Sequence, residues 1–96
     1  MPPSIAPIPP WALKKILELR GFEVVAQDDF NWAMADPKQP SSEPMIIPRT
    51  GERVAVDIMM QTFIDGRMNL REYFELRDQV LGKDWLYKAA DGEGAK

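Results

Sequence analysis

The sequence of 96 residues contains neither cysteine nor histidine. Without cysteine the chain forms no disulfide, offers no thiolate nucleophile and lacks the usual ligand of structural zinc sites. Without histidine it lacks the side chain that most often serves as a general base and as a metal ligand. We therefore expect no metal and no cofactor, and any catalysis would depend on Asp, Glu, Lys, Tyr or hydroxyl groups.

Positive charge is also scarce. The 12 Lys and Arg residues face 15 Asp and Glu residues, which gives a net charge of −3. The balance is even along the chain, because residues 1–50 hold five bases and six acids and residues 51–96 hold seven and nine. Nucleic-acid binding requires several phosphates to be neutralised by Lys and Arg. The composition therefore disfavours RNA as the main partner.

Targeting signals are missing from the printed sequence. The opening "MPPSIAPIPP" has no basic start, and five prolines interrupt it, so it is not a signal peptide. No apolar run approaches the length of a membrane span. We expect a soluble, cytoplasmic protein without a membrane partner.

The chain divides into three parts. Residues 1–9 are a proline-rich arm, which we expect to be flexible. Residues 10–82 have the composition of a single domain, and residues 83–96 form a C-terminal tail whose last residues are predicted to be disordered. The tail contains three candidates for docking on the core: Trp85, Leu86 and Tyr87.

The domain shows helical spacing at its start and strand-like runs after it. Leu13, Ile16 and Leu17 define an apolar helix face, and Gly21 followed by Phe22 predicts a Schellman ending in which Phe22 packs back on Leu17. Short β-branched or alternating runs then predict three strands, with a tight hairpin between the first two. Their expected ranges are 22–27, 30–35 and 45–48.

Two further helices follow the strands. The first, from about Glu52 to Ile64 and closed by Gly66, is apolar over more than half its circumference, so we expect it to be the most buried helix, or to expose a partner-binding patch. The second begins after Asn69, a good N-cap with Glu72 at the capping-box position. The predicted fold class is α+β, a small α-β-β-β-α(-α) sandwich with a three-stranded antiparallel sheet and helices on one face.

One stretch, "QDDFNWAMADP" at residues 27–37, combines acids, an amide and large aromatics. Its polar residues, Asp28, Asp29 and Asn31, could supply a carboxylate base or oxygen ligands, but Asp and Asn also form turns by bonding their own backbone, and we favour the turn. Phe30 and Trp32 alternate as core-facing strand residues would. The other interpretation of these rings is a platform on which bases stack.

Basic residues on the first helix and near the second are the candidates for binding RNA or a partner. In some RNA-binding domains, basic residues on a helix and on the loop that follows it contact the phosphate backbone. The alternative is an ordinary solvated face, because acids interrupt the pattern. The candidate residues are Lys14, Lys15, Arg20, Arg49 and Arg53.

Two blocks of the sequence and the spacing between them carry a resemblance to a known family. They are "LKKILELRGFEVVAQ" and "MIIPRTGERVAVDIMMQTFIDGRMNLREYFEL", and they resemble the HicA (YcfA-like) toxin–antitoxin ribonucleases, which have a double-stranded-RNA-binding-like fold. The resemblance spans residues 13–76, about two thirds of the chain. It implies an mRNA-cleaving toxin whose protein partner is a HicB-like antitoxin.

The chain departs from that family where the chemistry would be. The family's glycine–serine/threonine–histidine motif falls on Asp29, Phe30 and Asn31, and the histidine that often follows "PR" is Thr50 here. Asn31 does not titrate, and a hairpin tip does not offer Asp29 the burial that would raise its pKa. We therefore expect a non-catalytic HicA-like domain that binds a protein partner. The alternatives are a toxin with atypical active-site residues and an RNA binder without chemistry.

Overall fold

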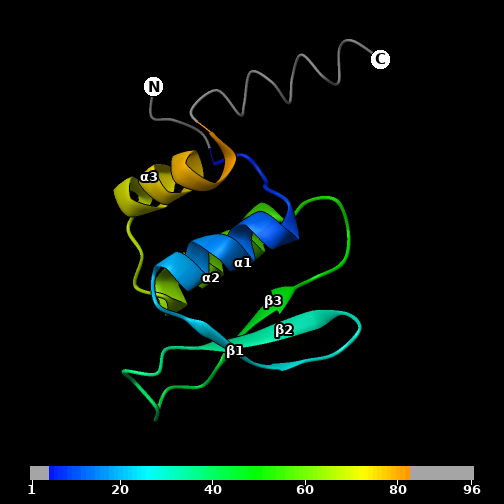
Figure 1. Cartoon of the computed structure of the whole chain (residues 1–96). Coiled ribbons are helices and arrows are strands. Elements are labelled where there is room, and N and C mark those ends of the chain that lie inside the picture. The colour runs from blue at the N-terminus through cyan, green and yellow to red at the C-terminus, as the bar shows by residue number, and fades with distance from the viewer. Residues whose placement is uncertain (1–4, 83–96) are drawn as a thin grey trace.

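The computed structural model describes residues 5–82 of the chain. The sheet has the order β1-β2-β3, and both strand pairs are antiparallel, which confirms the predicted α+β class (Figure 1). The predictions for residues 1–4 and for the tail, including Trp85, Leu86 and Tyr87, lie outside the described residues. The elements are α1 (Pro10–Leu19), β1 (Glu23–Gln27), β2 (Asn31–Ala35), β3 (Met45–Pro48), α2 (Val56–Asp65) and α3 (Leu70–Leu81).

The helices form two layers on one side of the sheet. Both α1 and α2 contact β3, whereas α3 packs on α1 and lies farther from the strands (Figure 1). The opposite face of the sheet is not covered by any described element. No helix within residues 5–82 is long and apolar enough to span a bilayer.

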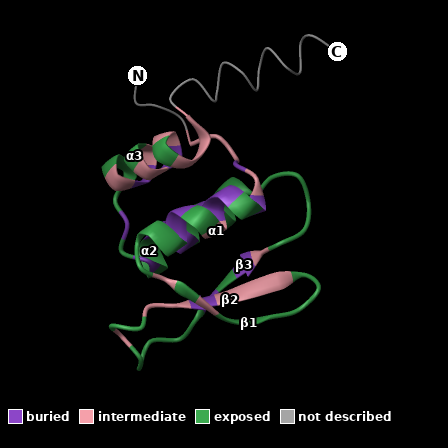
Figure 2. Cartoon of the chain, in the orientation of Figure 1, coloured by how far each residue is buried: buried purple, intermediate pink, exposed green. Residues whose placement is uncertain are grey.

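The most buried helix is α1, not α2 as the apolar content of α2 predicts. Four α1 side chains have no exposed surface, because α1 lies between the sheet and α3 (Figure 2). They are Ala12, Leu13, Ile16 and Leu17. In α2 only Met59, Thr62 and Phe63 are buried, and the surplus apolar residues Val56, Ile58, Met60 and Ile64 are exposed by 37–68%.

Tyr73 anchors α3 to the rest of the core. Its side chain is fully buried, and its ring centroid lies 4.5 Å from that of Phe63 in α2. Burial raises the pKa of the Tyr73 hydroxyl to about 12, an effect that the neighbouring Arg77 guanidinium partly opposes. The hydroxyl therefore stays protonated across the physiological pH range, and the Tyr73 side chain packs in the core as a neutral group.

The helix α2 begins at Val56, four residues later than its predicted start at Glu52. The backbone N–H of Val54 donates to the Ile8 carbonyl at 2.8 Å, and both side chains are buried, so this segment is held against the N-terminal arm before the helix starts. The prediction of a flexible arm over residues 1–9 did not anticipate that Ile8 belongs to the core.

The Schellman ending predicted for α1 is present. Gly21 has a φ of 96°, Phe22 N–H donates to the Leu17 carbonyl at 3.0 Å, and Gly21 N–H donates to the Glu18 carbonyl at 3.0 Å. Any side chain at Gly21 would be strained by this left-handed backbone. The ending turns the chain directly from α1 into β1.

The helix α2 ends at Gly66, as predicted, and in the same hydrogen-bonding pattern, with Arg67 as its left-handed residue. Arg67 has the positive φ of 54°, and Met68 N–H donates to the Phe63 carbonyl at 2.9 Å. A Cβ at Gly66 would lie 3.0 Å from the Thr62 carbonyl oxygen, which is a tight contact, and 3.6 Å from the Phe22 ring, which is an ordinary van der Waals distance. The backbone at Arg67 costs about 1–2 kcal/mol for a residue with a Cβ.

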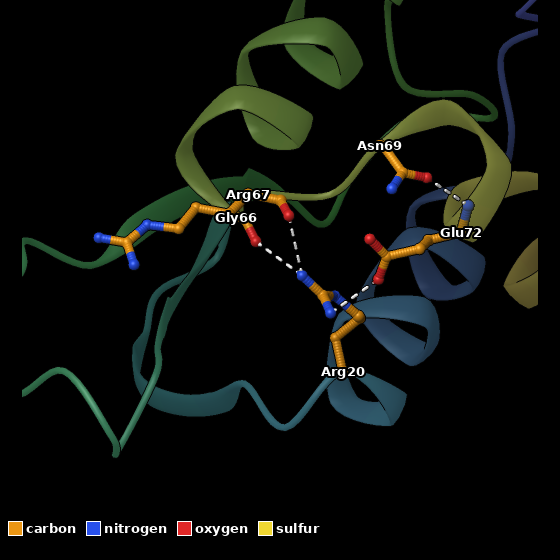
Figure 3. Close-up of polar contacts among 5 residues, drawn as sticks. All are labelled: Arg20, Gly66, Arg67, Asn69 and Glu72. Atoms are coloured by element: carbon orange, nitrogen blue, oxygen red, sulfur yellow. Dashed lines mark hydrogen bonds and ion pairs between the residues drawn. The ribbon is translucent and has the colours of Figure 1, made fainter.

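Arg20, just after α1, holds this ending in place (Figure 3). Its guanidinium donates to the carbonyls of Gly66 at 3.2 Å and Arg67 at 3.0 Å, and it pairs with the Glu72 carboxylate at 2.8 Å. Asn69 caps α3 by accepting from Glu72 N–H at 2.8 Å, while the Glu72 carboxylate turns to Arg20 (Figure 3). The cation thus meets the negative end of α2 and an acid in the first turn of α3.

Replacing Arg20 with methionine should lower the free energy of unfolding by about 2 kcal/mol, because two carbonyls and a carboxylate lose a charged donor. Urea unfolding followed by circular dichroism measures this loss. The matched control is Arg71→Met, which removes the same charge from a side chain that is 90% exposed and 3.9 Å from Glu75. The control should change stability by less than about 0.5 kcal/mol, and equal losses in the two variants would contradict the role of Arg20.

Candidate functional site

The hairpin between β1 and β2 is built on the Asp28 side chain. Its carboxylate accepts from Phe30 N–H at 2.8 Å and from Asn31 N–H at 2.7 Å, and its own N–H donates to the Asn31 carbonyl at 3.0 Å. The hydrogen bonds from Phe30 and then Asn31 hold the pKa of Asp28 below its usual value, and the Arg49 charge lowers it further. Asp28 is thus an ionised turn residue, as the preferred interpretation of this stretch predicts.

Phe30 lies in the turn and not in the strand that its alternation with Trp32 predicts. Its N–H is bound by Asp28 and its carbonyl accepts from Arg49 N–H at 2.9 Å, so β2 begins only at Asn31. The Phe30 side chain is 66% exposed. The prediction of a core-facing Phe30 is therefore wrong, because the turn takes three residues where two were expected.

Asn31 faces a shallow hollow on the open side of the sheet. It pairs with Pro48 across β2 and β3, and the next outward pair is Ala33 with Ile46. The hollow has a volume of about 180 Å³ and is lined by Ala26, Gln27, Asp28, Asn31, Ala33 and Ile46.

This hollow offers no group that would take a proton from a ribose hydroxyl. An amide does not titrate, and a carboxylate with a lowered pKa is a poor base near neutral pH. Asp29 does not line the hollow, and Thr50 is exposed on the loop that follows β3. Within residues 5–82 no group of acids is arranged to hold a metal ion.

Trp32 lies between two of the predicted basic residues. The Lys14 ammonium is 5.4 Å and the Arg49 guanidinium 5.7 Å from a Trp32 ring centroid, distances typical of cation–π contacts. Arg49 also donates to the Asp28 carbonyl at 2.8 Å, and Lys14 pairs with Glu18 at 3.5 Å. The nearest bases in sequence are Arg20 and Lys38, so only the fold reveals this arrangement.

The predicted basic edge is only partly assembled. Lys14 and Arg49 meet at Trp32, and Lys15 is exposed one residue farther along α1. Arg20 is committed to the ends of α2 and α3, and Arg53 is exposed in the segment that precedes α2. The structure therefore gathers two of the five basic candidates around one ring.

The open face of the sheet carries apolar side chains whose exposure the sequence patterns did not predict. Val25 is 57% and Ile46 60% exposed, and the Phe30 ring projects from the adjoining turn. A solvent-facing side of an antiparallel sheet normally alternates to polar residues. A bulge between Val24 and Ala26 distorts the β1 edge, and Pro48 ends β3, so neither edge is suited to receive an added strand.

Removing the turn carboxylate by Asp28→Ala should lower the urea midpoint at pH 7, whereas Asp29→Ala should leave it unchanged. Since folding lowers the Asp28 pKa, its ionisation stabilises the fold above the unfolded pKa near 3.8 and loses this effect as the pH falls through the folded value. The gap between wild type and Asp28→Ala should therefore narrow at pH 3. Equal midpoints at pH 7 would show that the turn does not depend on Asp28.

The chain was compared with protein-family models, with curated proteins and with solved structures, and no match was found in any of the three. The function is consequently proposed from the geometry of the chain.

Proposed function

We propose that this chain is a non-catalytic binding domain whose partner is a protein that docks on the open face of the sheet. The observation that carries the proposal is the exposure of Val25, Ile46 and Phe30, each by more than half, on a face that no described element covers. Exposed apolar side chains on one face of a domain are typical of protein interaction surfaces.

The absence of suitable chemistry at the hairpin supports a binding role. Asp28 is occupied by two backbone N–H groups, and Asn31 has no titratable proton where the HicA-like resemblance would need an imidazole. Asp29 is exposed at the turn tip. None of the three is therefore placed as a base for proton transfer.

The character of the open face favours protein over RNA. Apart from Glu23, which pairs with Ala35, its outward strand residues are aliphatic or neutral, and the acids Asp28 and Asp29 stand at the hairpin end, where they would repel phosphate. The blunted sheet edges favour a partner that covers the face with apolar side chains. The resemblance to the HicA family suggests that this partner is a HicB-like antitoxin.

The substitutions Val25→Lys and Ile46→Lys should each weaken partner binding by tenfold or more, because each places a charge in the apolar contact. Cross-linking of the tagged chain in its native cells and mass spectrometry identify the partner, and titration calorimetry then measures its affinity. The matched control is Ile64→Lys on α2, where the original side chain is 68% exposed. If the control lost affinity while Val25→Lys and Ile46→Lys bound normally, the interface would not lie on the sheet and the proposal would be contradicted.

The arrangement around Trp32 favours a second candidate, single-stranded RNA binding without cleavage. A ring flanked by Lys14 and Arg49 combines the stacking and charge that such sites use. Fluorescence anisotropy with labelled single-stranded RNA distinguishes the two candidates. Salt-sensitive binding that is abolished by Lys14→Glu with Lys15→Glu, but not by Ile46→Lys, would support RNA in place of a protein partner.

A further inference from the structure

A groove opens on the helical side of the molecule, away from the open face of the sheet. It has a volume of about 520 Å³, within the range of about 300–1,000 Å³ typical of ligand pockets. Its apolar side chains come from α1, β2 and α3: Trp11, Leu19, Trp32 and Val80. Lys14, Lys15, Glu18 and Gln79 complete its lining.

The apolar lining of this groove is open to solvent. Trp11 is 56% and Leu19 49% exposed, and their spacing of eight residues places them on one face of α1. A single exposed apolar residue needs no explanation, but several that converge on one hollow indicate a contact surface. No element within residues 5–82 covers the groove.

The C-terminal end of the described chain lies at this groove. Val80 lines it, and α3 ends one residue later at Leu81. Gly82 has a φ of 95° and a ψ of 151°, a backbone that only glycine adopts readily, so the chain leaves the helix axis there. The described part of the chain therefore ends close to the groove.

The residues that follow are suited in length and composition to fill it. Only Lys83 and Asp84 separate Gly82 from the consecutive apolar side chains of Trp85, Leu86 and Tyr87. Three residues span up to roughly 10 Å, which suffices to bring Trp85 back over the last turn of α3. A tether this short gives an effective concentration in the millimolar range, an advantage that a separate molecule lacks.

We propose that the C-terminal segment docks in this groove, with Trp85 and Leu86 packed among Trp11, Leu19 and Val80. Such docking would bury Trp11 and Leu19, which are exposed in the groove. This inference goes beyond the proposed function, because the sheet face that would receive the partner lies on the other side of the molecule.

Nuclear magnetic resonance of the full chain tests the docking directly. We expect nuclear Overhauser contacts from the Leu86 methyls to the Leu19 and Val80 methyls, unchanged on tenfold dilution. Amide exchange at residues 85–87 should be slowed by at least about tenfold relative to an unstructured chain. The variant Leu19→Glu should abolish both signals, whereas Ile64→Glu, an exposed α2 position outside the groove, should preserve them.

A second variant keeps the test decisive if Leu19→Glu fails to fold. The double substitution Trp85→Ser and Leu86→Ser should shift the indole N–H resonances of Trp11 and Trp32 and leave the other core resonances in place. Unstructured chemical shifts at residues 85–87, or unmoved indole resonances, would overturn the proposal. Contacts seen only between differently labelled copies would overturn it as well, since the occupant would then be a second molecule.

Discussion

The arrangement of the three helices depends on the guanidinium of Arg20. It meets two backbone carbonyls at the end of α2 and the carboxylate of Glu72 in the first turn of α3. These are the places where the α2 dipole leaves negative charge and where α3 carries its acid. The same contacts bind the carbonyl of Arg67, whose left-handed backbone is unfavourable by itself. One side chain thus connects the end of α1 to the end of α2 and to the first turn of α3.

A second arginine has the corresponding role at the hairpin. Arg49 donates to the Asp28 carbonyl through its side chain and to the Phe30 carbonyl through its backbone, and its guanidinium lies over Trp32. Both arginines are plausible phosphate ligands in the sequence alone. In the fold, Arg20 is committed to structure, and Arg49 is shared between the turn and the aromatic ring. Arg20 and Arg49 thus make their contacts among the helices and at the hairpin. Neither side chain covers the open face of the sheet.

The parts of the fold that follow from local sequence signals were predictable. The end of α1 at Gly21 and Phe22 and the start of α3 at Asn69 rest on residues within one turn of each other, and both are present. The turn at Asp28 is of the same kind, because the carboxylate binds N–H groups two and three residues ahead.

The features that the sequence did not predict depend on distant partners. Arg20 bonds to a carbonyl 46 residues away, and the start of α2 is set by the contact between Val54 and Ile8. The greater burial of α1 than α2 arises because α3 folds back onto α1. The grouping of the basic candidates was not predictable for the same reason. Lys14 and Arg49 are far apart in the sequence, and only the fold brings both of them to Trp32.

We propose that the hairpin is a structural turn and that the chain binds a partner without cleaving RNA. The most direct measurement is RNA cleavage by the purified full-length chain, followed on denaturing gels with end-labelled RNA beside the Asp29→Ala, Asn31→Ala double variant. From this proposal we expect wild type and variant both to leave the RNA intact, as buffer alone does. Cleavage by the wild type that disappears in the double variant would contradict it.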